Sequence, residues 1–331
     1  MHELSLVTGG AGFIGSHLVE ELVRRGRPVR VFDDFSTGLR SNLVPGTDLV
    51  EGSLTDPAAI AVAMRDVGVV YHLGALASVA RSIEAPAASH AACATGTLNL
   101  LDAARRGGVR RVVYAASSSA YGGDAKPGCG QREDQMPVAK SPYAAAKLAG
   151  EFYMQAFAAS YGIETVRLRF FNIFGPRQRA DSPYSGVIAL FIAAMSRGEC
   201  PTIQGDGLQS RDFTYVANAV QALVRAADAG DVSGNVYNVG TGRGATIRDL
   251  VNALNRIFGT HSESNFAPSR AGDVRFSRAD MQRTCEDLGY APAVGFEDGL
   301  RKTVVWYLES SDSFRTLGTP YTATGVRASS R

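Results

Sequence analysis

Short runs of apolar, mostly β-branched residues alternate with longer amphipathic segments along the first half of the chain. The short runs lack a regular polar/apolar alternation, which is typical of strands buried on both faces of a parallel sheet. The longer segments have helical periodicity and lie between the strands, an order that predicts an α/β fold with a doubly wound sheet. We predict strands over residues 4–8, 29–33, 49–52, 69–73, 112–117 and 164–170, and helices over 13–25, 57–65, 87–106 and 144–161.

The pattern loosens after residue 172, where loops rich in Gly, Pro, Asp and Ser separate shorter elements. The first domain is therefore assigned to residues 1–172, with parts of 212–242 returning to its sheet. A smaller mixed α/β lobe is assigned to 173–309, and residues 310–331 are predicted to form a flexible tail. Helices of the lobe are expected over 186–195, 216–229, 246–258 and 279–288.

The composition excludes several classes of protein. Of the 331 residues, 45% are apolar and 20% are charged, which is typical of a globular protein and not of a disordered chain. The net charge is +2, without a block of Lys and Arg, which argues against a nucleic-acid partner. The longest apolar run, residues 187–195, is too short to cross a bilayer, which takes about 20 residues. Four scattered cysteines favour reduced thiols in a metal-free cytoplasmic protein.

A glycine-rich turn, TGGAGFIG, connects the first predicted strand to the first helix. Gly9 permits a tight turn, Gly12 lets a pyrophosphate approach the backbone, and Gly15 allows close helix–strand packing. The helix N-terminus supplies unpaired N–H groups for the anion. Asp33 ends the second predicted strand, where a carboxylate accepts hydrogen bonds from a ribose 2′-OH and repels a 2′-phosphate. Together these features predict an NAD site rather than a plain tight turn, with Asp34 interpreted as a solvated turn residue.

Three further residues form a candidate catalytic group. Ser117 ends a predicted strand, at the edge where an open α/β sheet places its ligands. Tyr143 and Lys147 are four residues apart on a predicted helix and share one face. A nearby ammonium favours tyrosinate, so we expect Lys147 to lower the pKa of Tyr143 and make it a general base. The alternative, an exposed Tyr/Lys pair without chemistry, is disfavoured by the neighbouring NAD loop.

Several segments together resemble one known family, and the resemblance extends from residue 4 to about residue 308. They read TGGAGFIGSHLVEEL, YHLGALASVARSI, SPYAAAKLAGE, RFFNIFGPRQ, GDGLQSRDFTYVANAVQA, YNVGTG and RAGDVRFSRAD. The chain is similar to the extended short-chain dehydrogenase/reductase family, and within it to the NAD-dependent nucleotide-sugar epimerases and dehydratases. The branch that it most resembles contains the UDP-N-acetylglucosamine and UDP-glucose 4-epimerases. This resemblance implies a Rossmann-type sheet followed by a smaller substrate-binding lobe.

The resemblance also implies roles for individual residues. Tyr143 would be the base, Lys147 its modulator and a ligand of the nicotinamide ribose, and Ser117 the third catalytic residue. Ser117 is chosen because the family's serine or threonine lies four residues before the Tyr-Gly pair matched by Tyr121-Gly122. The cofactor-binding residues implied in addition to Tyr143 and Lys147 are Gly9, Gly12, Phe13, Ile14, Gly15, Asp33, Asp34, Ser53, Leu54, Leu73, Gly74, Ala75 and Phe170. The substrate-binding residues implied are Ser118, Ser119, Asn172, Val187, Arg211, Arg270, Asp273 and Ser277.

Two of these substrate assignments have structural alternatives. Arg211 would bind the diphosphate, because a guanidinium suits phosphate oxygens, but it could instead pair with Asp212. Arg270 and Asp273 match the pair that holds phosphate and the UDP ribose, whereas Asp273 could also be a loop cap.

The implied reaction is inversion at C4 of a UDP-hexose through a transient 4-keto sugar. Related dehydratases have Asp-Glu directly after the catalytic residue, and uronate decarboxylases have a Glu there, whereas this chain has Ser118 and Ser119. Dehydration and decarboxylation are therefore disfavoured. Ser277 matches a position where a bulky Tyr excludes N-acetylated sugars, which favours UDP-GlcNAc and UDP-GalNAc, with or without UDP-Glc and UDP-Gal.

Three positions depart from the family pattern: Ser53 replaces an Asp, Cys93 an Asn and Gly74 an Ala. Each change alters a cofactor contact, which predicts weaker retention of NAD. The family usually dimerises through a four-helix bundle, so a homodimer through residues 87–106 and 144–161 is expected, unless those faces are buried within one chain.

Two other functions are compatible with the sequence. Another nucleotide-sugar epimerase, or a 4-keto-forming dehydrogenase or reductase, could be built on the same scaffold, and the dehydrogenase would consume NAD(H). A non-catalytic NAD-binding sensor would be expected to lack Tyr143 or Lys147, both of which are present. No nucleic-acid or membrane partner is expected.

Overall fold

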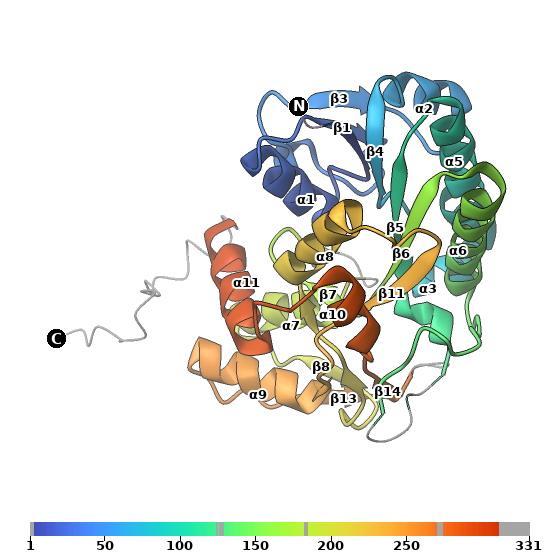
Figure 1. Ribbon diagram of the computed structural model, residues 1–331. Helices are drawn as coiled ribbons and strands as arrows, with labels where there is room; N and C mark the ends of the chain where they lie inside the picture. The colour runs from blue at the N-terminus through green and yellow to red at the C-terminus, as the bar shows by residue number, and fades with distance from the viewer. Residues whose placement is uncertain (1–2, 124, 126–128, 182–184, 270–273, 311–331) are drawn as a thin grey trace.

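The computed structural model describes residues 3–123, 125, 129–181, 185–269 and 274–310. Within these residues, seven parallel strands form one sheet in the order β11-β6-β5-β4-β1-β2-β3, which confirms the doubly wound fold (Figure 1). The sequence order reverses at β1, so the first strand lies in the middle of the sheet. The strands are β1 (Leu4–Thr8), β2 (Val29–Asp33), β3 (Asp48–Glu51), β4 (Val67–His72), β5 (Arg111–Ser117), β6 (Glu164–Phe170) and β11 (Asn235–Val239).

Helices cover both faces of the sheet because successive residues of each central strand are buried on opposite sides. Leu6 and Val112 pack into one core, whereas their neighbours Val7 and Val113 pack into the other. This explains why the strands read as continuous apolar runs. Helices α1 (Phe13–Arg24) and α8 (Val216–Asp228) contact each other over one face, and α2 (Pro57–Ala63), α5 (Gly96–Arg106) and α6 (Pro142–Tyr161) cover the other (Figure 1).

Several predicted boundaries were wrong. The helix predicted over 87–106 is three consecutive pieces: α4 (Pro86–His90), a π-helix (Ala91–Thr95) and α5. The strand predicted over 69–73 begins at Val67 and ends at His72. Helix α3 (Val79–Glu84) and helix α11 (Phe296–Ser310) were not predicted, and α10 (Gln282–Leu288) begins three residues later than expected.

The lobe has its own hydrophobic core. Helices α7 (Val187–Ser196), α9 (Ile247–Phe258) and α11 pack around Phe174, whose ring contacts those of Phe213 and Phe296 edge to face. In Figure 1 these helices lie to the left of the main sheet and below it. Short strands connect them: β7 (Ile173–Phe174), β8 (Thr202–Gln204), β9 (Ser210–Arg211), β10 (Thr214–Tyr215), β12 (Ala245–Thr246), β13 (Asn265–Ala267) and β14 (Phe276–Ser277). No helix in the described ranges is long and apolar enough to cross a membrane.

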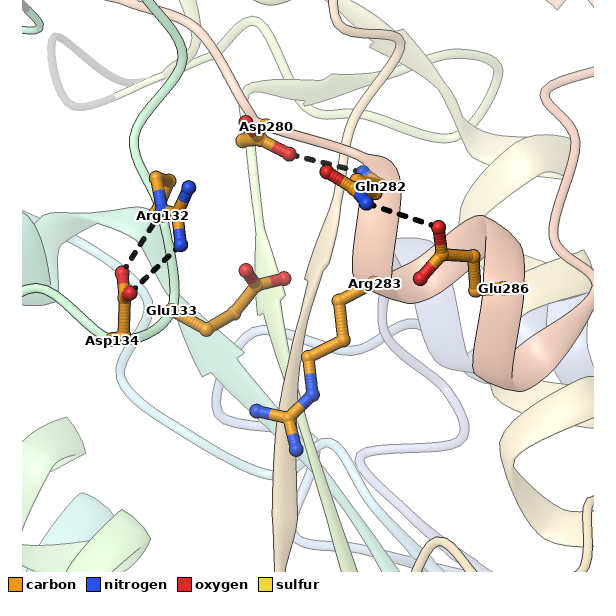
Figure 2. Close-up of a pocket in the computed structure, with 7 residues that line it drawn as sticks. All are labelled: Arg132, Glu133, Asp134, Asp280, Gln282, Arg283 and Glu286. Carbon is orange, nitrogen blue, oxygen red and sulfur yellow. Dashed lines mark hydrogen bonds and ion pairs between the residues drawn. The ribbon is translucent and has the colours of Figure 1, made fainter.

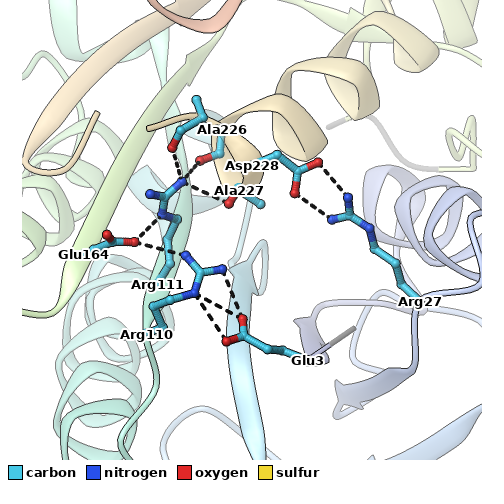
Figure 3. A network of polar contacts seen from close by, with 9 residues as sticks. Glu3, Arg27, Arg110, Arg111, Glu164, Ala226, Ala227 and Asp228 are labelled. Atoms are coloured by element: carbon cyan, nitrogen blue, oxygen red, sulfur yellow. Dashed lines mark hydrogen bonds and ion pairs between the residues drawn. The ribbon is translucent and has the colours of Figure 1, made fainter. Parts of the chain in front are cut away.

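A polar network closes the amino-terminal edge of the sheet (Figure 3). Arg111, the first residue of β5, is buried, and its Nη1 donates to the carbonyls of Ala226, Ala227 and Ala229 at 3.1, 2.9 and 2.6 Å. These carbonyls lie at the C-terminal end of α8, where helix carbonyls lack partners within the helix. The guanidinium therefore caps α8 and fixes it to β5, at the opposite end of that strand from Ser117.

Candidate functional site

The carboxyl ends of the parallel strands lie along one edge of the main sheet, and most of the predicted site residues gather there. Ser117 ends β5, and its register partner on β6 is Phe170. Thr8 ends β1 and is the register partner of His72 on β4. The phosphate loop and the candidate catalytic serine are therefore separated by one strand, at the edge where open α/β sheets bind ligands.

The loop after β1 has the geometry of an anion site. Gly9 has a φ of 68°, and a Cβ built on Gly15 would lie 2.1 Å from the carbonyl oxygen of Gly9. Helix α1 begins after Gly12, and no side chain caps its first N–H groups. The first two residues of the helix, Phe13 and Ile14, pack against the core of the lobe. Uncapped N–H groups beside glycines that admit no Cβ fit the pyrophosphate of NAD.

The two acidic residues after the second strand have different surroundings. Asp33 is buried, and its carboxylate accepts hydrogen bonds from the N–H groups of Ala11 and Phe35, both at 2.9 Å. Burial raises the pKa of Asp33, and these hydrogen bonds oppose the shift. Asp34 is exposed and accepts from the N–H of Ser36 at 2.9 Å, which matches the solvated turn residue expected there. The role of Asp33 in ribose binding stays a prediction.

A buried chain of hydrogen bonds links the phosphate loop to the π-helix. Thr8 Oγ1 accepts from the N–H of Gly74 at 3.1 Å and lies 2.8 Å from His72 Nδ1. His72 Nε2 lies 3.0 Å from Thr97 Oγ1, which donates to the Cys93 carbonyl at 2.6 Å. Every group in this chain is satisfied when the imidazole is neutral with its proton on Nε2. Burial lowers the pKa of His72 to about 3, which keeps it neutral.

Two groups of the implied cofactor-binding residues, 53–54 and 73–75, lie next to each other. A Cβ built on Gly74 would lie 2.8 Å from Leu54 Cδ1, so the glycine at this position leaves room for Leu54. The Ser53 hydroxyl lies 2.9 Å from the hydroxyl of Thr55. The structure thus gives a packing reason for one of the three departures from the family pattern.

The three candidate catalytic residues lie together. Tyr143 and Lys147 are in the first turns of α6, and Ser117 lies close enough to Tyr143 for its side chain to lower the tyrosine pKa. Lys147 is buried, and its Nζ donates to the carbonyl of Ala115 at 2.8 Å. The ammonium also lies 4.7 Å from the centre of the Tyr114 ring, a cation–π contact.

The expected lowering of the Tyr143 pKa by Lys147 was wrong for this structure. Burial raises the pKa of Tyr143, and the Ser117 side chain opposes the shift only in part. Burial also lowers the pKa of Lys147. The cause is desolvation, which disfavours both charged forms, together with the direction of the ammonium toward Ala115.

Cys93 is buried beside these residues. It lies in the π-helix and packs against Tyr143 and Ala146. Single-turn π-bulges frequently occur at functional sites, and here the widened turn carries the side chain that contacts the candidate base.

The two serines after Ser117 begin a short 3-10 helix (Ser118–Tyr121). Ser117 Oγ caps it by accepting from the N–H of Ser119 at 3.2 Å. Ser119 Oγ is buried and has no hydrogen-bond partner among the described residues. Buried hydroxyls nearly always have a partner, so this one is suited to a ligand. Asn172 is half-buried and lies two residues after β6 ends at Phe170.

The lobe brings two predicted substrate residues together. Arg211 and Ser277 are register partners on the adjacent strands β9 and β14. Asp212 accepts hydrogen bonds from Thr241 and Ala279, and Arg211 Nη1 donates to the Ser210 carbonyl at 2.9 Å. The role of Arg211 in diphosphate binding stays a prediction. Val187 begins α7 and is half-buried. Arg270 and Asp273 lie outside the described residues.

A buried ion pair, which was not predicted, joins α6 to β6. Glu151, one turn beyond Lys147, accepts hydrogen bonds from Arg169 at 3.0, 3.2 and 2.8 Å. Both side chains are nearly inaccessible to solvent. The guanidinium lies 4.8 Å from the centre of the Tyr121 ring, and the Tyr121 hydroxyl donates to Asn238 Oδ1 at 2.6 Å. This arrangement connects α6, the end of β6, the 3-10 helix and β11.

A polar cavity of about 290 Å³ lies outside β11 (Figure 2). Its side chains mostly pair with one another: Arg132 with Asp134, and Gln282 with Glu286. Glu133 accepts from the backbone N–H of Asn238 at 2.8 Å and thereby covers part of this edge strand. Most charged and polar side chains that line the cavity are therefore already paired with one another.

Comparisons with known proteins agree with this geometry. The model of the NAD dependent epimerase/dehydratase family matches residues 5–240. A UDP-glucose 4-epimerase of Mycolicibacterium smegmatis is 37% identical over 319 residues, which cover 93% of this chain and 99% of that protein. A UDP-N-acetyl-alpha-D-glucosaminuronate decarboxylase of Bacillus cytotoxicus is 33% identical over 324 residues, with 93% and 99% covered.

Solved structures give the same result. A UDP-glucose 4-epimerase of Thermotoga maritima with UDP-glucose has a TM-score of 0.89 and 37% identity, and the match covers 93% of this chain and 99% of that one. A UDP-N-acetylglucosamine 4-epimerase of Methanobrevibacter ruminantium in complex with UDP-N-acetylmuramic acid has a TM-score of 0.88 and 35% identity, covering 94% and 99%. A Thermus thermophilus UDP-glucose 4-epimerase in complex with NAD has a TM-score of 0.85 and 36% identity, covering 95% and 99%.

Proposed function

Because the chain belongs to the NAD-dependent epimerase/dehydratase family, we propose that it is a 4-epimerase of UDP-hexoses, acting on UDP-GlcNAc/UDP-GalNAc, UDP-Glc/UDP-Gal or both. The observation that carries this proposal is the pair Ser118–Ser119. Neither side chain has the carboxyl group that removal of water or of a carboxylate would need at this position, and Ser119 Oγ is a buried hydroxyl without a partner in the described chain. A site with one candidate base and no acid at these two positions supports inversion without further chemistry.

The chain's own residues would act as follows. The Ser117 hydroxyl would hold the sugar 4-OH while Tyr143 takes its proton. Bound NAD would supply the hydride acceptor for oxidation at C4 and the hydride donor for the return to the opposite face of the sugar. Arg211 would hold the diphosphate while the keto sugar turns, since a guanidinium binds phosphate oxygens bidentately. Lys147 would bind the nicotinamide ribose from its position beside Tyr143.

The test is direct. The purified protein is incubated with NAD⁺ and, separately, UDP-GlcNAc, UDP-Glc and UDP-glucuronate, and C4 inversion is followed by NMR. Interconversion without net NADH is the expected result with at least one of the first two sugars. Formation of one NADH per sugar would instead identify a dehydrogenase. Loss of the carboxyl group from UDP-glucuronate would identify a decarboxylase. No turnover of any of the three sugars would overturn the assignment.

Substrate size provides a more specific prediction. Ser277 is almost fully buried beside Arg211, so replacing it with Tyr fills space in the proposed sugar pocket. We expect Ser277→Tyr to reduce kcat/KM for UDP-GlcNAc about 10- to 200-fold more than for UDP-Glc, the usual range for one pocket contact. Ser277→Ala, which adds no volume, should leave the ratio of the two rates unchanged. Equal losses with both sugars would contradict the pocket assignment.

We also propose a homodimer. Helix α6 carries Phe152 and Tyr153, which are 58% and 37% exposed in the single chain. Exposed aromatic residues on a long helix are typical of interfaces. Sedimentation should give the mass of two chains, and Phe152→Glu should shift the protein toward the mass of one.

We also propose that residues 1–172, with parts of 212–242, bind NAD and that residues 173–309 bind the substrate. The NAD loop lies in the first part, and Arg211 and Ser277 lie on the short strands of the lobe. A cytoplasmic location stays a prediction from the unpaired cysteines.

A further inference from the structure

Asp212 is a fully buried carboxylate in the lobe, and the proposed chemistry does not use it. It lies between β9 and β10, directly after Arg211. Oδ1 accepts from the N–H of Thr241 at 2.8 Å, from the Thr241 hydroxyl at 2.7 Å and, more weakly, from the Thr214 hydroxyl at 3.4 Å. Oδ2 accepts from the N–H groups of Gly242 at 2.9 Å and Ala279 at 3.2 Å. One side chain thus joins three segments that are distant in the sequence.

The chemistry of these partners requires an ionised carboxylate. All five contacts are made by donors, or by hydroxyls that can donate, and a carboxylate offers only acceptors. An asparagine cannot replace it, because its NH₂ group would face either Thr241 or the N–H groups of Gly242 and Ala279. Buried N–H groups would then lose their acceptor.

The segments that Asp212 joins are those that form the proposed substrate site. Strand β9, with Arg211, lies between β12 and β14, and Ser277 on β14 is only two residues before Ala279. The turn at Thr241 follows Gly240, where an added Cβ would lie 2.7 Å from both Asp212 Oδ2 and Ala279 Cβ. Asp280 is fixed separately, because its N–H donates to the Gln131 carbonyl at 2.9 Å. The carboxylate therefore determines how closely β9, the Thr241 turn and the end of β14 approach one another.

We propose that Asp212 is a positioning residue for the nucleotide-diphosphate end of the substrate site: it fixes the strand carrying Arg211 against the strand carrying Ser277 and does not touch the substrate itself. This inference rests on the proposed function, since it assumes that Arg211 and Ser277 face a UDP-sugar. Its consequence is selective. Loss of the carboxylate disturbs the lobe and leaves the phosphate loop after β1 unchanged, because none of the hydrogen bonds of Asp212 reaches that loop.

The experiment compares the binding of two probes, UDP and NAD⁺, by calorimetry in wild type, Asp212→Asn and a matched control, Asp249→Asn. Asp249 lies in the same lobe and forms the capping box of α9 with Thr246, next to the register partner of Arg211 on β12, so it controls for a general disturbance beside β9. We expect Asp212→Asn to weaken UDP binding at least tenfold and to raise KM for the sugar nucleotide more than it lowers kcat. NAD⁺ affinity should remain within about twofold, and Asp249→Asn should leave both affinities unchanged.

A second pair of variants keeps the test valid if Asp212→Asn does not fold. Thr241→Val removes one donor and retains the carboxylate, so UDP binding should weaken severalfold, whereas Thr241→Ser retains the hydroxyl and should restore it. Folded variants that bind UDP as wild type does would overturn the proposal, as would an equal loss of NAD⁺ binding. A wild-type protein that binds NAD⁺ but not UDP would overturn the proposed function instead.

Discussion

Replacing Tyr143 with Phe is expected to lower kcat for C4 inversion about 10²- to 10⁴-fold, the contribution of a positioned acid–base group. The phenyl ring keeps the packing against Cys93 and Ala146, and only the hydroxyl, whose pKa the Ser117 side chain lowers, is lost. NAD⁺ affinity and the thermal unfolding temperature should therefore be almost unchanged. Initial rates measured by NMR and NAD⁺ binding measured by calorimetry check both parts.

The same helix provides a matched control for this change. Tyr153 is a partly exposed tyrosine ten residues further along α6, so Tyr153→Phe makes the same chemical change outside the candidate catalytic group. It should retain full activity. If Tyr143→Phe retained activity within about threefold of wild type, Tyr143 would not be the base.

Removing Glu151 is expected to destabilise the fold by about 3–5 kcal/mol, because Arg169 would be left as a buried charge without its partner. Both side chains are almost fully buried, and the remaining Nη1 of Arg169 already has no partner among the described residues. The variant Glu151→Leu should show this loss in urea unfolding monitored by circular dichroism. The transition must first be shown to be two-state.

Two comparisons separate the cost of a lone charge from the cost of lost packing. The double variant Glu151→Leu/Arg169→Met should recover most of the stability, since apolar residues of similar volume often replace a buried pair without loss. Glu199→Leu breaks an exposed pair with Arg197 and should cost less than about 1 kcal/mol. A double variant as unstable as the single one would show that the ion pair is not the cause.

The features that could be predicted from the sequence depend on local patterns. Continuous apolar runs predicted the strands because both faces of the sheet are buried, and the glycine spacing predicted the loop because Gly9 and Gly15 admit no Cβ. Helix α11 shows a pattern that was available but not used: Leu300, Val304 and Tyr307 are buried at helical spacing. This spacing of apolar residues, which lies just N-terminal to the Ser-rich segment, would have predicted the helix.

The remaining features depend on contacts between distant segments. The hydrogen-bond partners of His72 are separated from it by 25 and 64 positions in the sequence, and those of Asp212 by 29 and 67 positions. No local sequence pattern therefore predicts either set of contacts. The pKa of Tyr143 could not be inferred from the Tyr/Lys spacing, because burial outweighs the effect of a lysine whose ammonium points toward Ala115. Local patterns therefore identified the candidate catalytic groups, and tertiary contacts determine their electrostatics.

The order of strands in the main sheet also affects how the chain emerges during synthesis. Strand β6 ends at Phe170, but its neighbour β11 ends at Val239, after the first half of the lobe has been made. At roughly 5–20 residues per second, the ribosome needs about 3–14 s to cover that interval. During this time β6 is an unpaired edge with Val166, Leu168 and Phe170 on one face, the kind of edge that pairs with other nascent chains. We therefore expect the interval between β6 and β11 to be a period in which the nascent chain is prone to pairing with other chains.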